Sequence, residues 1–384
     1  MQPRGVWCIL RRVYQIELSY TLGETRAPAH TIRNPLMDLL DAIREHGSIS
    51  ATAKAMGLSY RHVWGELKKW EQRLGHSLIV WEKGHAARLS EFGDKLLWAE
   101  RQAQARLAPQ IEALHANLER TFAVAFDDAA HVVALHASHD DALASLREHS
   151  VAASKLHLDI RFTGSVDAIS ALNQGRCVMA GFHVPHQPGS DSLAARTYKP
   201  LLKPGLHKII GFAQRSQGLI VARGNPLHIT SLADLQKPSL RFVNRPLGAG
   251  TRVLLDEMLA RDGIDPRDIA GYARTEPSHA AVAQAVAGAS ADAGLGIESA
   301  ARARNLDFVP LVREDYFLVC LKTALELPAT QALLAILRSD AWQARLARMA
   351  GYAPSNSGEV LAMSRMLPWW NFSRPKRRAA KPAD

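Results

Sequence analysis

Residues 34–89 read NPLMDLLDAIREHGSISATAKAMGLSYRHVWGELKKWEQRLGHSLIVWEKGHAARL, and this stretch decides the fold of the N-terminal part of the chain. Asn34 can cap a helix whose first residue is Pro35, where the missing backbone N–H costs nothing. Apolar residues at helical spacing from Leu36 to Ile43 give this helix one buried face, and Gly47 can end it. The sequence therefore predicts an amphipathic helix at the start of the stretch.

The next residues have the turn chemistry of a helix-turn-helix. Ser48 or Ser50 can cap a short second helix, in which the small side chain of Ala53 lets a neighbouring helix approach closely. Gly57 can supply the positive φ of the turn, and Ser59 can cap the helix that follows. This order of caps and glycine is typical of a helix-turn-helix that reads DNA.

The third helix, at about residues 60–74, has an apolar face and a polar face that begins with large hydrogen-bond donors. In a helix-turn-helix such residues meet base edges in the major groove. Residues 78–89 are rich in β-formers and fit the two strands of a wing that contacts phosphate. The alternative is a helical bundle with a solvated basic face, which the turn chemistry disfavours. The predicted DNA-binding residues are Ser59, Tyr60, Arg61, His62, Trp64 and Lys68 on the helix, and Lys83, His85 and Arg88 on the wing.

The whole chain has 384 residues and a formal net charge of +10, and 47% of its residues are hydrophobic. This composition predicts packed domains rather than disorder. The charge is uneven, because residues 1–120 carry a net +4 and residues 365–384 a net +5, which leaves +1 for the residues between them. A basic N-terminal part suits nucleic acid, and a nearly neutral middle suits a small ligand.

Cys8, Cys177 and Cys320 are widely separated and odd in number, which is typical of reduced cysteines rather than of a disulfide framework or a zinc site. No apolar run approaches the 18 or more residues that a membrane span needs. The first ten residues are too short, and have the wrong flanks, for a signal peptide. We therefore expect a cytoplasmic protein that does not cross a membrane.

After the wing, Ser90 can cap a long helix over residues 91–122, which Pro109 can kink. Its apolar stripe needs a partner, and we expect a second copy of the chain, because two-fold symmetry would place two recognition helices on successive faces of the major groove. The alternative is that the stripe packs on its own chain. The stripe consists of Phe92, Leu96, Ala99, Ala103, Leu107, Ile111, Leu114 and Leu118.

Two motifs, GSISATAKAMGLSYRHVWGEL at 47–67 and LSEFGDKLL at 89–97, carry a family resemblance. Through them residues 11–120 resemble the DNA-binding domain of ModE-type molybdate-responsive regulators, which share features with LysR-type regulators. The resemblance implies a winged helix-turn-helix domain at 11–90, a dimerisation helix at 91–122 and a homodimer that binds double-stranded DNA. Alternation at residues 13–22 also predicts an extra strand beside the wing.

From residue 131 the sequence alternates short apolar strands with helices, which indicates a parallel sheet with helices on its faces. The pattern pauses near residue 185 and resumes at about residue 239. We therefore expect two α/β lobes, with residues 219–222 and 294–297 as candidates for the segments that join them.

The motifs TGSVDAISALNQGRCVMAGFH at 163–183 and FVNRPLGAGTRVLLDEML at 242–259 carry a second resemblance. Residues 131–352 are similar to the type 2 periplasmic-binding-protein-like domain described as molybdate-binding-like. The resemblance implies that the effector is molybdate, tungstate or a molecule tied to molybdenum-cofactor metabolism. ModE regulators proper bind molybdate in small β-barrels, which this sequence does not resemble, so their ligand residues cannot be transferred to this chain.

In a two-lobed fold, helix N-termini from both lobes point into the cleft, where their free N–H groups favour an anion. Four loops here place hydroxyl groups beside such amides. The alternative is that each Ser or Thr is only a helix cap and that Arg252 only pairs with Asp256. The predicted ligand-binding residues are Ser138, His139, Gly164, Ser165, Gly250, Thr251, Arg252 and Ser278.

Other site chemistry is weakly indicated. His131, His136 and His139 crowd one stretch, but loop or core positions explain them as well as a metal does, and we predict no metal site. The segment PLGAGTR at 246–252 lacks the spacing of a dinucleotide-binding loop. No nucleophile–base pair or carboxylate pair stands out. We therefore predict no catalytic residues and no covalent cofactor, and we do not expect an enzyme.

The sequence thus predicts an α+β winged helix-turn-helix domain with a long dimerisation helix, followed by a two-lobed α/β periplasmic-binding-protein-like domain and, at 365–384, a basic disordered tail. We expect a dimeric, ligand-responsive transcriptional regulator. Its effector would be molybdate or tungstate or, alternatively, a small organic acid of the LysR kind. The alternative of another class is a solute-binding protein for an importer, against which the winged helix argues.

Overall fold

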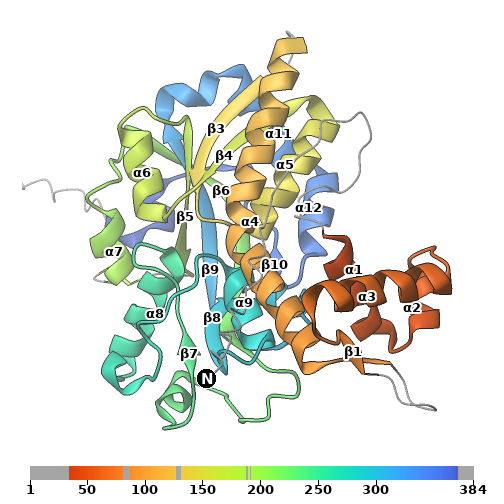
Figure 1. The fold of residues 1–384 in the computed structure, drawn as a ribbon. Coiled ribbons are helices and arrows are strands. Elements are labelled where there is room, and N and C mark those ends of the chain that lie inside the picture. The colour runs from red at the N-terminus through yellow and green to blue at the C-terminus, as the bar shows by residue number, and fades with distance from the viewer. Residues whose placement is uncertain (1–33, 81–86, 127–130, 187–188, 191, 371–384) are drawn as a thin grey trace, which may run out of the picture.

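The computed structural model describes residues 34–80, 87–126, 131–186, 189–190 and 192–370 (Figure 1). A small helical head is followed by one long helix and a larger C-terminal α/β domain. This order is the predicted one. The head contains α1 (Pro35–His46), α2 (Ile49–Ala55), α3 (Tyr60–Leu74), β1 (Ile79–Val80) and β2 (Arg88–Leu89).

The caps of the head are those that the sequence predicts. The side chain of Asn34 accepts a hydrogen bond from the backbone N–H of Leu36, and Pro35 is the first residue of α1. Ser48, rather than Ser50, caps α2, and Ser59 caps α3. Gly57 in the turn has a φ of 67°, which an L side chain rarely adopts. Local backbone chemistry therefore sets the helix boundaries of the head.

The predicted wing is an antiparallel pair in which Ile79 lies opposite Leu89. Its tip, which carries Lys83 and His85, lies outside the described residues, as does the extra strand expected at 13–22. The Ser90 hydroxyl accepts from the backbone N–H of Gly93 at 3.0 Å and donates to the carbonyl of Ser77 at 2.5 Å. This serine therefore fixes the exit of the wing into the long helix.

The long helix α4 (Glu91–Phe126) runs from the head along a face of the C-terminal domain (Figure 1). Leu97, Ala105 and Pro109 are buried on the side that packs against its own chain. Of the predicted apolar stripe, Phe92 and Leu96 pack on the core of the head, and Ile111 is half-buried. Ala99, Ala103, Leu107 and Leu114 remain exposed on the other side of the helix.

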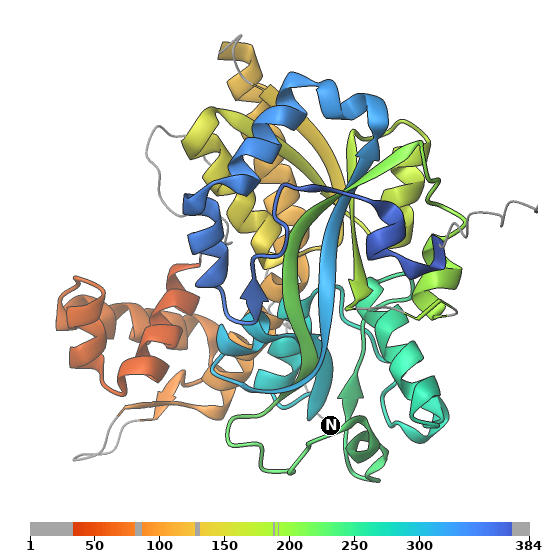
Figure 2. The same cartoon turned by 180° about the vertical axis from the view of Figure 1, so that it is seen from behind.

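The C-terminal domain is built on one curved sheet with the strand order β4-β3-β5-β9-β6-β8-β7. The expected parallel pairing holds at its two ends, for β3 with β4 and β5 and for β7 with β8. In the centre, β6 (His207–Val221) and β9 (Asp307–Leu321) are long, antiparallel strands that run through both lobes (Figure 2). The lobes are therefore joined mainly by this pair, whereas residues 294–297, predicted as a joint, lie within β8.

One apolar core is confined to the first lobe and another to the second, and a third contains buried side chains from both lobes. The first lobe contains β3 (His131–Ala137), α5 (Asp141–Ser154), β4 (Leu156–Phe162), α6 (Ser165–Asn173), β5 (Met179–Pro185) and α7 (Leu193–Tyr198). The second contains η1 (Leu232–Gln236), β7 (Phe242–Val243), α8 (Gly250–Arg261), η2 (Pro266–Asp268), α9 (His279–Ala287), β8 (Ala293–Ile297) and α10 (Glu298–Arg302).

The chain then returns to the first lobe and extends beyond the predicted limit at residue 352. Residues 365–370, which were predicted to belong to a disordered tail, are folded, because Leu367 and Trp369 are buried in the core of the first lobe. Residues 371–384 lie outside the described part. The returning elements are η3 (Lys322–Glu326), α11 (Pro328–Arg338), α12 (Asp340–Ala347), β10 (Tyr352–Ala353), β11 (Val360–Leu361), α13 (Met363–Met366) and η4 (Pro368–Trp370).

None of the described helices has the length and apolar character needed to cross a membrane.

Candidate effector site and DNA-binding face

Loops from the two lobes meet at the N-termini of α6 and α8. A Cβ atom placed on Gly164 would lie 2.6 Å from the carbonyl oxygen of Gly248, so this contact between the lobes requires glycine. Ser138 Oγ lies 3.5 Å from Ser165 Oγ, and a Cβ on Gly250 would lie 3.4 Å from that same Ser165 oxygen. Four of the predicted ligand-binding residues, Ser138, Gly164, Ser165 and Gly250, therefore come together from different lobes.

Thr251, a fifth predicted residue, belongs to a buried hydrogen-bond network. Its hydroxyl accepts from Gln217 Nε2 at 2.9 Å, and the same nitrogen donates to Glu314 Oε2 at 2.8 Å. Arg215 donates to Glu314 at 2.9 Å and to Asp140 at 2.5 Å. Burial raises the pKa of Glu314, while the neighbouring guanidinium lowers it. Arg215 is thus hydrogen-bonded to both carboxylates.

Arg245 lies in the same cluster without a carboxylate partner among the described residues. Its side chain donates to the carbonyl of Pro277 at 2.9 Å, but Nε and Nη1 are buried and have no hydrogen-bond partner in that part of the chain. Burial, together with the positive charge of Arg215, lowers the pKa of Arg245 to about 10. A buried cation of this kind favours an anion beside it.

Two buried histidines flank the arginines. Burial, with the charges of Arg215 and Arg245, holds the pKa values of His183 and His279 well below the usual range, so both rings are neutral near pH 7. Both ring nitrogens of His183, Nδ1 of His279 and the hydroxyl of Tyr316 have no hydrogen-bond partner among the described residues. The rings of His183 and Tyr316 are 3.7 Å apart between centroids. The cluster therefore presents neutral hydrogen-bonding groups as well as a charge.

The other three predicted ligand-binding residues have partners of their own. His139 lies 3.2 Å from Glu112 of α4, and Arg252 pairs with Asp256 at 2.9 Å over the ring of Tyr272. The Ser278 hydroxyl caps α9 and donates to the carbonyl of Ala105 in α4 at 3.2 Å. The structure thus agrees with the alternative explanations of two of these residues. Arg252 is in an ion pair with Asp256, and Ser278 is a helix cap.

Comparison with known proteins identifies both domains. Residues 36–94 match the bacterial regulatory helix-turn-helix proteins of the lysR family, and residues 146–338, half of the chain, match the PBP superfamily domain. The chain belongs to the PBP superfamily. With its lysR-family head it has the organisation of a LysR-type transcriptional regulator with an effector-binding domain. Such regulators are not enzymes, in agreement with the expectation from the sequence.

Two curated relatives have sequence identities above 30%. The uncharacterized protein YvgK of Bacillus subtilis (strain 168) is 34% identical over 201 residues, 52% of this chain and 64% of that protein. An uncharacterized protein encoded in the ferredoxin 2Fe-2S gene 5′ region of Clostridium pasteurianum is 38% identical over 110 residues, 28% of this chain and 97% of that protein. The chain thus spans less than two thirds of the length of YvgK.

Solved structures with similar folds have low sequence identity. CbnR, a LysR family transcriptional regulator solved with its target DNA, is 17% identical with a TM-score of 0.37, covering 77% of this chain and 95% of that chain. A BenM variant is 14% identical with a TM-score of 0.42, covering 84% and 98%. A phosphate-bound substrate-binding protein from Clostridium perfringens is 14% identical with a TM-score of 0.45, covering 59% and 100%.

In this chain the sequence analysis missed the most buried members of the polar cluster around Arg245, which we name the effector-site cluster because it is the candidate site. Arg215 and Gln217 lie two residues apart on the long strand β6, so their side chains share one face of the sheet. Their polar character within the apolar run IIGFAQRSQGLIV is the signal that could have located them. Arg245 lies two residues after the end of the short buried strand β7, and ligand-binding residues of α/β sheets concentrate at such strand ends.

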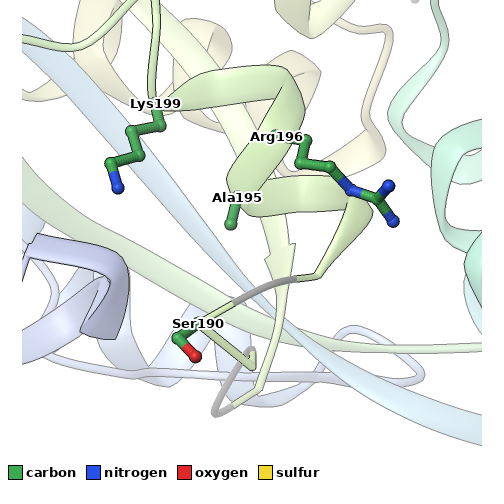
Figure 3. Close-up of a pocket in the computed structure, with 4 residues that line it drawn as sticks. All are labelled: Ser190, Ala195, Arg196 and Lys199. Atoms are coloured by element: carbon green, nitrogen blue, oxygen red, sulfur yellow. The ribbon is translucent and has the colours of Figure 1, made fainter.

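A surface hollow of about 390 Å³ next to α7 is a weaker candidate. It is lined by Ser190, Ala195, Arg196 and Lys199 (Figure 3). The side chains of Arg196 and Lys199 extend to opposite sides of the helix, and Lys199 lies over the ring of Trp370. The two cations therefore do not converge on one ligand. Among the described residues no group of three or more His, Cys, Asp or Glu could hold a metal ion.

On the head, the N-terminus of α3 is open to solvent. Tyr60, Arg61 and His62 are exposed, and Ser59 is engaged as the cap. Trp64 is half-buried, with the Lys68 ammonium 4.8 Å from its ring centre and 2.7 Å from Glu71. On the wing Arg88 is exposed. In the described part of the head, the exposed polar face of α3 therefore begins at the end that a recognition helix presents to DNA.

Replacing Arg245 by an apolar residue should stabilise the protein in the absence of ligand. Arg245→Met removes a buried guanidinium that has no counter-ion among the described residues, so the free energy of unfolding should rise by about 1–2 kcal/mol. Arg252→Met is the matched control, because Arg252 is also buried but has Asp256 as its partner, and this variant should lose stability. Urea unfolding monitored by circular dichroism measures both. A loss of stability in Arg245→Met as large as in the control would contradict the assignment.

Proposed function

We propose that this chain is a dimeric, DNA-binding transcriptional regulator that responds to a small anion held between the two lobes of its C-terminal domain. The observation that carries the effector part is Arg245, a buried cation without a carboxylate partner among the described residues, beside loops from both lobes. The N-termini of α6 and α8 add backbone N–H groups and partial positive charge at the same place. The resemblance to ModE makes molybdate and tungstate the first anions to test, and small organic acids are the alternative.

The DNA-binding part rests on the exposed N-terminus of α3. Arg61 and His62 are exposed at this end of the helix and would act as base-reading donors, with Trp64 and Lys68 on the same helix as further contacts. Arg88, with Lys83 and His85 of the wing, would contact phosphate. Lys68 is paired with Glu71, so this contact must be exchanged when DNA binds. An importer's solute-binding protein has no use for such a head.

The dimer part rests on α4. Ala103, Leu107 and Leu114 follow one another at helical spacing and are exposed on the side of α4 away from its own C-terminal domain. Pairing of this face with a second copy would bury it and bring two heads together on one DNA site.

The effector cluster and α4 are attached to one short loop. Arg245 donates to the carbonyl of Pro277, while the neighbouring Glu276 accepts from Arg106 of α4 at 2.7 and 2.9 Å and from Gln102 at 3.1 Å. Glu276 is 1% exposed, so its carboxylate is shielded from solvent, whereas the side chain of Arg106 is 51% exposed. An anion that repositions Arg245 would therefore act on α4 and, through it, on the head. The effect on DNA is a population shift, which requires that the anion prefer one arrangement of the lobes.

Arg61→Ala should weaken binding to DNA fragments that the unaltered protein selects from a random library by about 10- to 100-fold, the usual contribution of a base-reading arginine. Arg261→Ala, which removes an exposed arginine of the C-terminal domain, should leave binding unchanged. Fluorescence anisotropy measures both affinities at one fixed salt concentration. Equal affinities for the two variants would show that the recognition face lies elsewhere.

Thermal unfolding of the full chain should detect the anion. A ligand at a hundred times its dissociation constant stabilises the protein by about 2.7 kcal/mol. Molybdate, tungstate, sulfate and small carboxylates would be compared in the unaltered protein and in Arg245→Met. At least one anion should raise the Tm of the unaltered protein and not that of the variant. A shift of equal size in both proteins would remove Arg245 from the site.

Arg106→Met should uncouple the two domains. It breaks the bidentate contact with Glu276 but leaves the effector-site cluster intact, so the anion with the largest thermal shift should still bind. Its effect on DNA affinity, expected to be about 5- to 150-fold in the unaltered protein for a coupling of typical size, should largely disappear. Arg302→Met, which removes an exposed ion pair with Glu298, is the control. A full anion response in Arg106→Met would show that coupling follows another route.

A further inference from the structure

The polar atoms of the effector-site cluster that have no partner are not all donors. Arg245 offers two unpaired donor nitrogens, Nε and Nη1, and the Tyr316 hydroxyl and the neutral rings of His183 and His279 can donate or accept. Gln217 differs, because its Oε1 can only accept, and this atom is buried without a partner among the described residues. A ligand that satisfies the whole cluster must therefore supply a hydrogen-bond donor as well as a negative charge.

The orientation of the Gln217 amide is fixed by its neighbours. Nε2 lies 2.8 Å from Glu314 Oε2, an oxygen that already accepts from Nε of Arg215. An inverted amide would place the Gln217 oxygen against that carboxylate oxygen and leave no donor between them. The oxygen of Gln217 is thus the atom that remains unpaired, on a side chain with no exposed surface.

The acceptor and the cation belong to one small site. Gln217 and Arg215 share a face of β6, and Gln217 is bonded to Thr251 at the N-terminus of α8. The adjacent Gly250 approaches His183, whose ring is subject to the charges of both Arg215 and Arg245. Gln217 and Arg245 are therefore connected through neighbours that they share, namely Arg215 and His183.

We infer that the effector is a small carboxylic acid that carries a hydroxyl or amino group close to its carboxylate. The carboxylate pairs with Arg245, and the O–H or N–H group donates to Gln217 Oε1. A fully deprotonated tetrahedral oxyanion offers only acceptors and would leave Gln217 buried and unpaired. This inference rests on the proposed anion site and chooses between the two effector classes that the site admits.

Matched acids provide the test. The full-length protein would be titrated, with thermal unfolding as the readout, against acetate, glycolate and glycine, then propionate, lactate and alanine, then succinate, malate and aspartate, with molybdate and sulfate alongside. In at least one set a substituted acid should bind about tenfold or more tighter than its unsubstituted parent, because a site with a buried polar group discriminates strongly against a ligand that leaves it unpaired.

Two variants assign the discrimination to atoms. Gln217→Met removes the unpaired acceptor, so the preference for the substituted acid should fall toward onefold while the parent acid still binds. Arg245→Met should abolish binding of both. Gln343→Met, at a half-buried position of α12, controls for the substitution itself.

The outcomes separate this inference from the proposed function. If molybdate, sulfate or the unsubstituted acids bind as tightly as the substituted ones in the unaltered protein, the donor requirement is wrong and the anion site stands. If every shift persists in Arg245→Met, or if none of these anions shifts the Tm, the anion site itself is wrong, and the inference is wrong with it. If Gln217→Met fails to fold, the matched series in the unaltered protein still decides the donor requirement.

Discussion

The ion pairs of Arg215 connect the parts of the C-terminal domain around its centre. Arg215 lies on β6, and Glu314 lies opposite it on β9. Asp140 caps α5 in the first lobe. One guanidinium therefore joins the two long strands that run through both lobes to the start of α5. Tyr352 also donates to Asp140, which links the C-terminal strands to the same point. Removing one partner of a buried pair of this kind costs about 3–5 kcal/mol, because the other charge stays buried. These contacts thus hold the centre of the domain in one arrangement.

The same contacts explain why Arg245 has no carboxylate partner among the described residues. Arg215 occupies both nearby carboxylates, and Arg245, which enters from the second lobe, is left with a backbone carbonyl alone. Several buried polar atoms around it, such as those of His183 and Tyr316, have no hydrogen-bond partner among the described residues. A core selected for stability alone would not leave so many hydrogen bonds unmade, since each costs about 1–3 kcal/mol. A ligand that supplied the missing partners would regain that free energy on binding.

The sequence predicted the head far better than the effector site, for a physical reason. Caps such as Ser48 and Ser59, and a turn glycine such as Gly57, act on backbone within three residues of themselves, so their effect can be read locally. Hydroxyl residues at helix N-termini were found for the same reason. Arg245 and Gln217 depend on contacts between distant strands, which local reading does not give. The environment of Trp369 was also not predictable from its neighbours in the sequence. The basic residues that follow it indicate a solvated tail, but its side chain is buried in the core of the first lobe.

The position of α4 determines how a signal at the site would travel. In many two-domain proteins a flexible linker would absorb a movement of the sensor, but α4 is clamped at Glu276 and again where Glu112 meets His139 and Arg147. These contacts lie at the N-termini of α9 and α5, one on each lobe. A change in the angle between the lobes therefore alters the distance between two points to which a single helix is attached. A continuous helix resists stretching, so the strain would be relieved at one of its clamps or at the junction with the head.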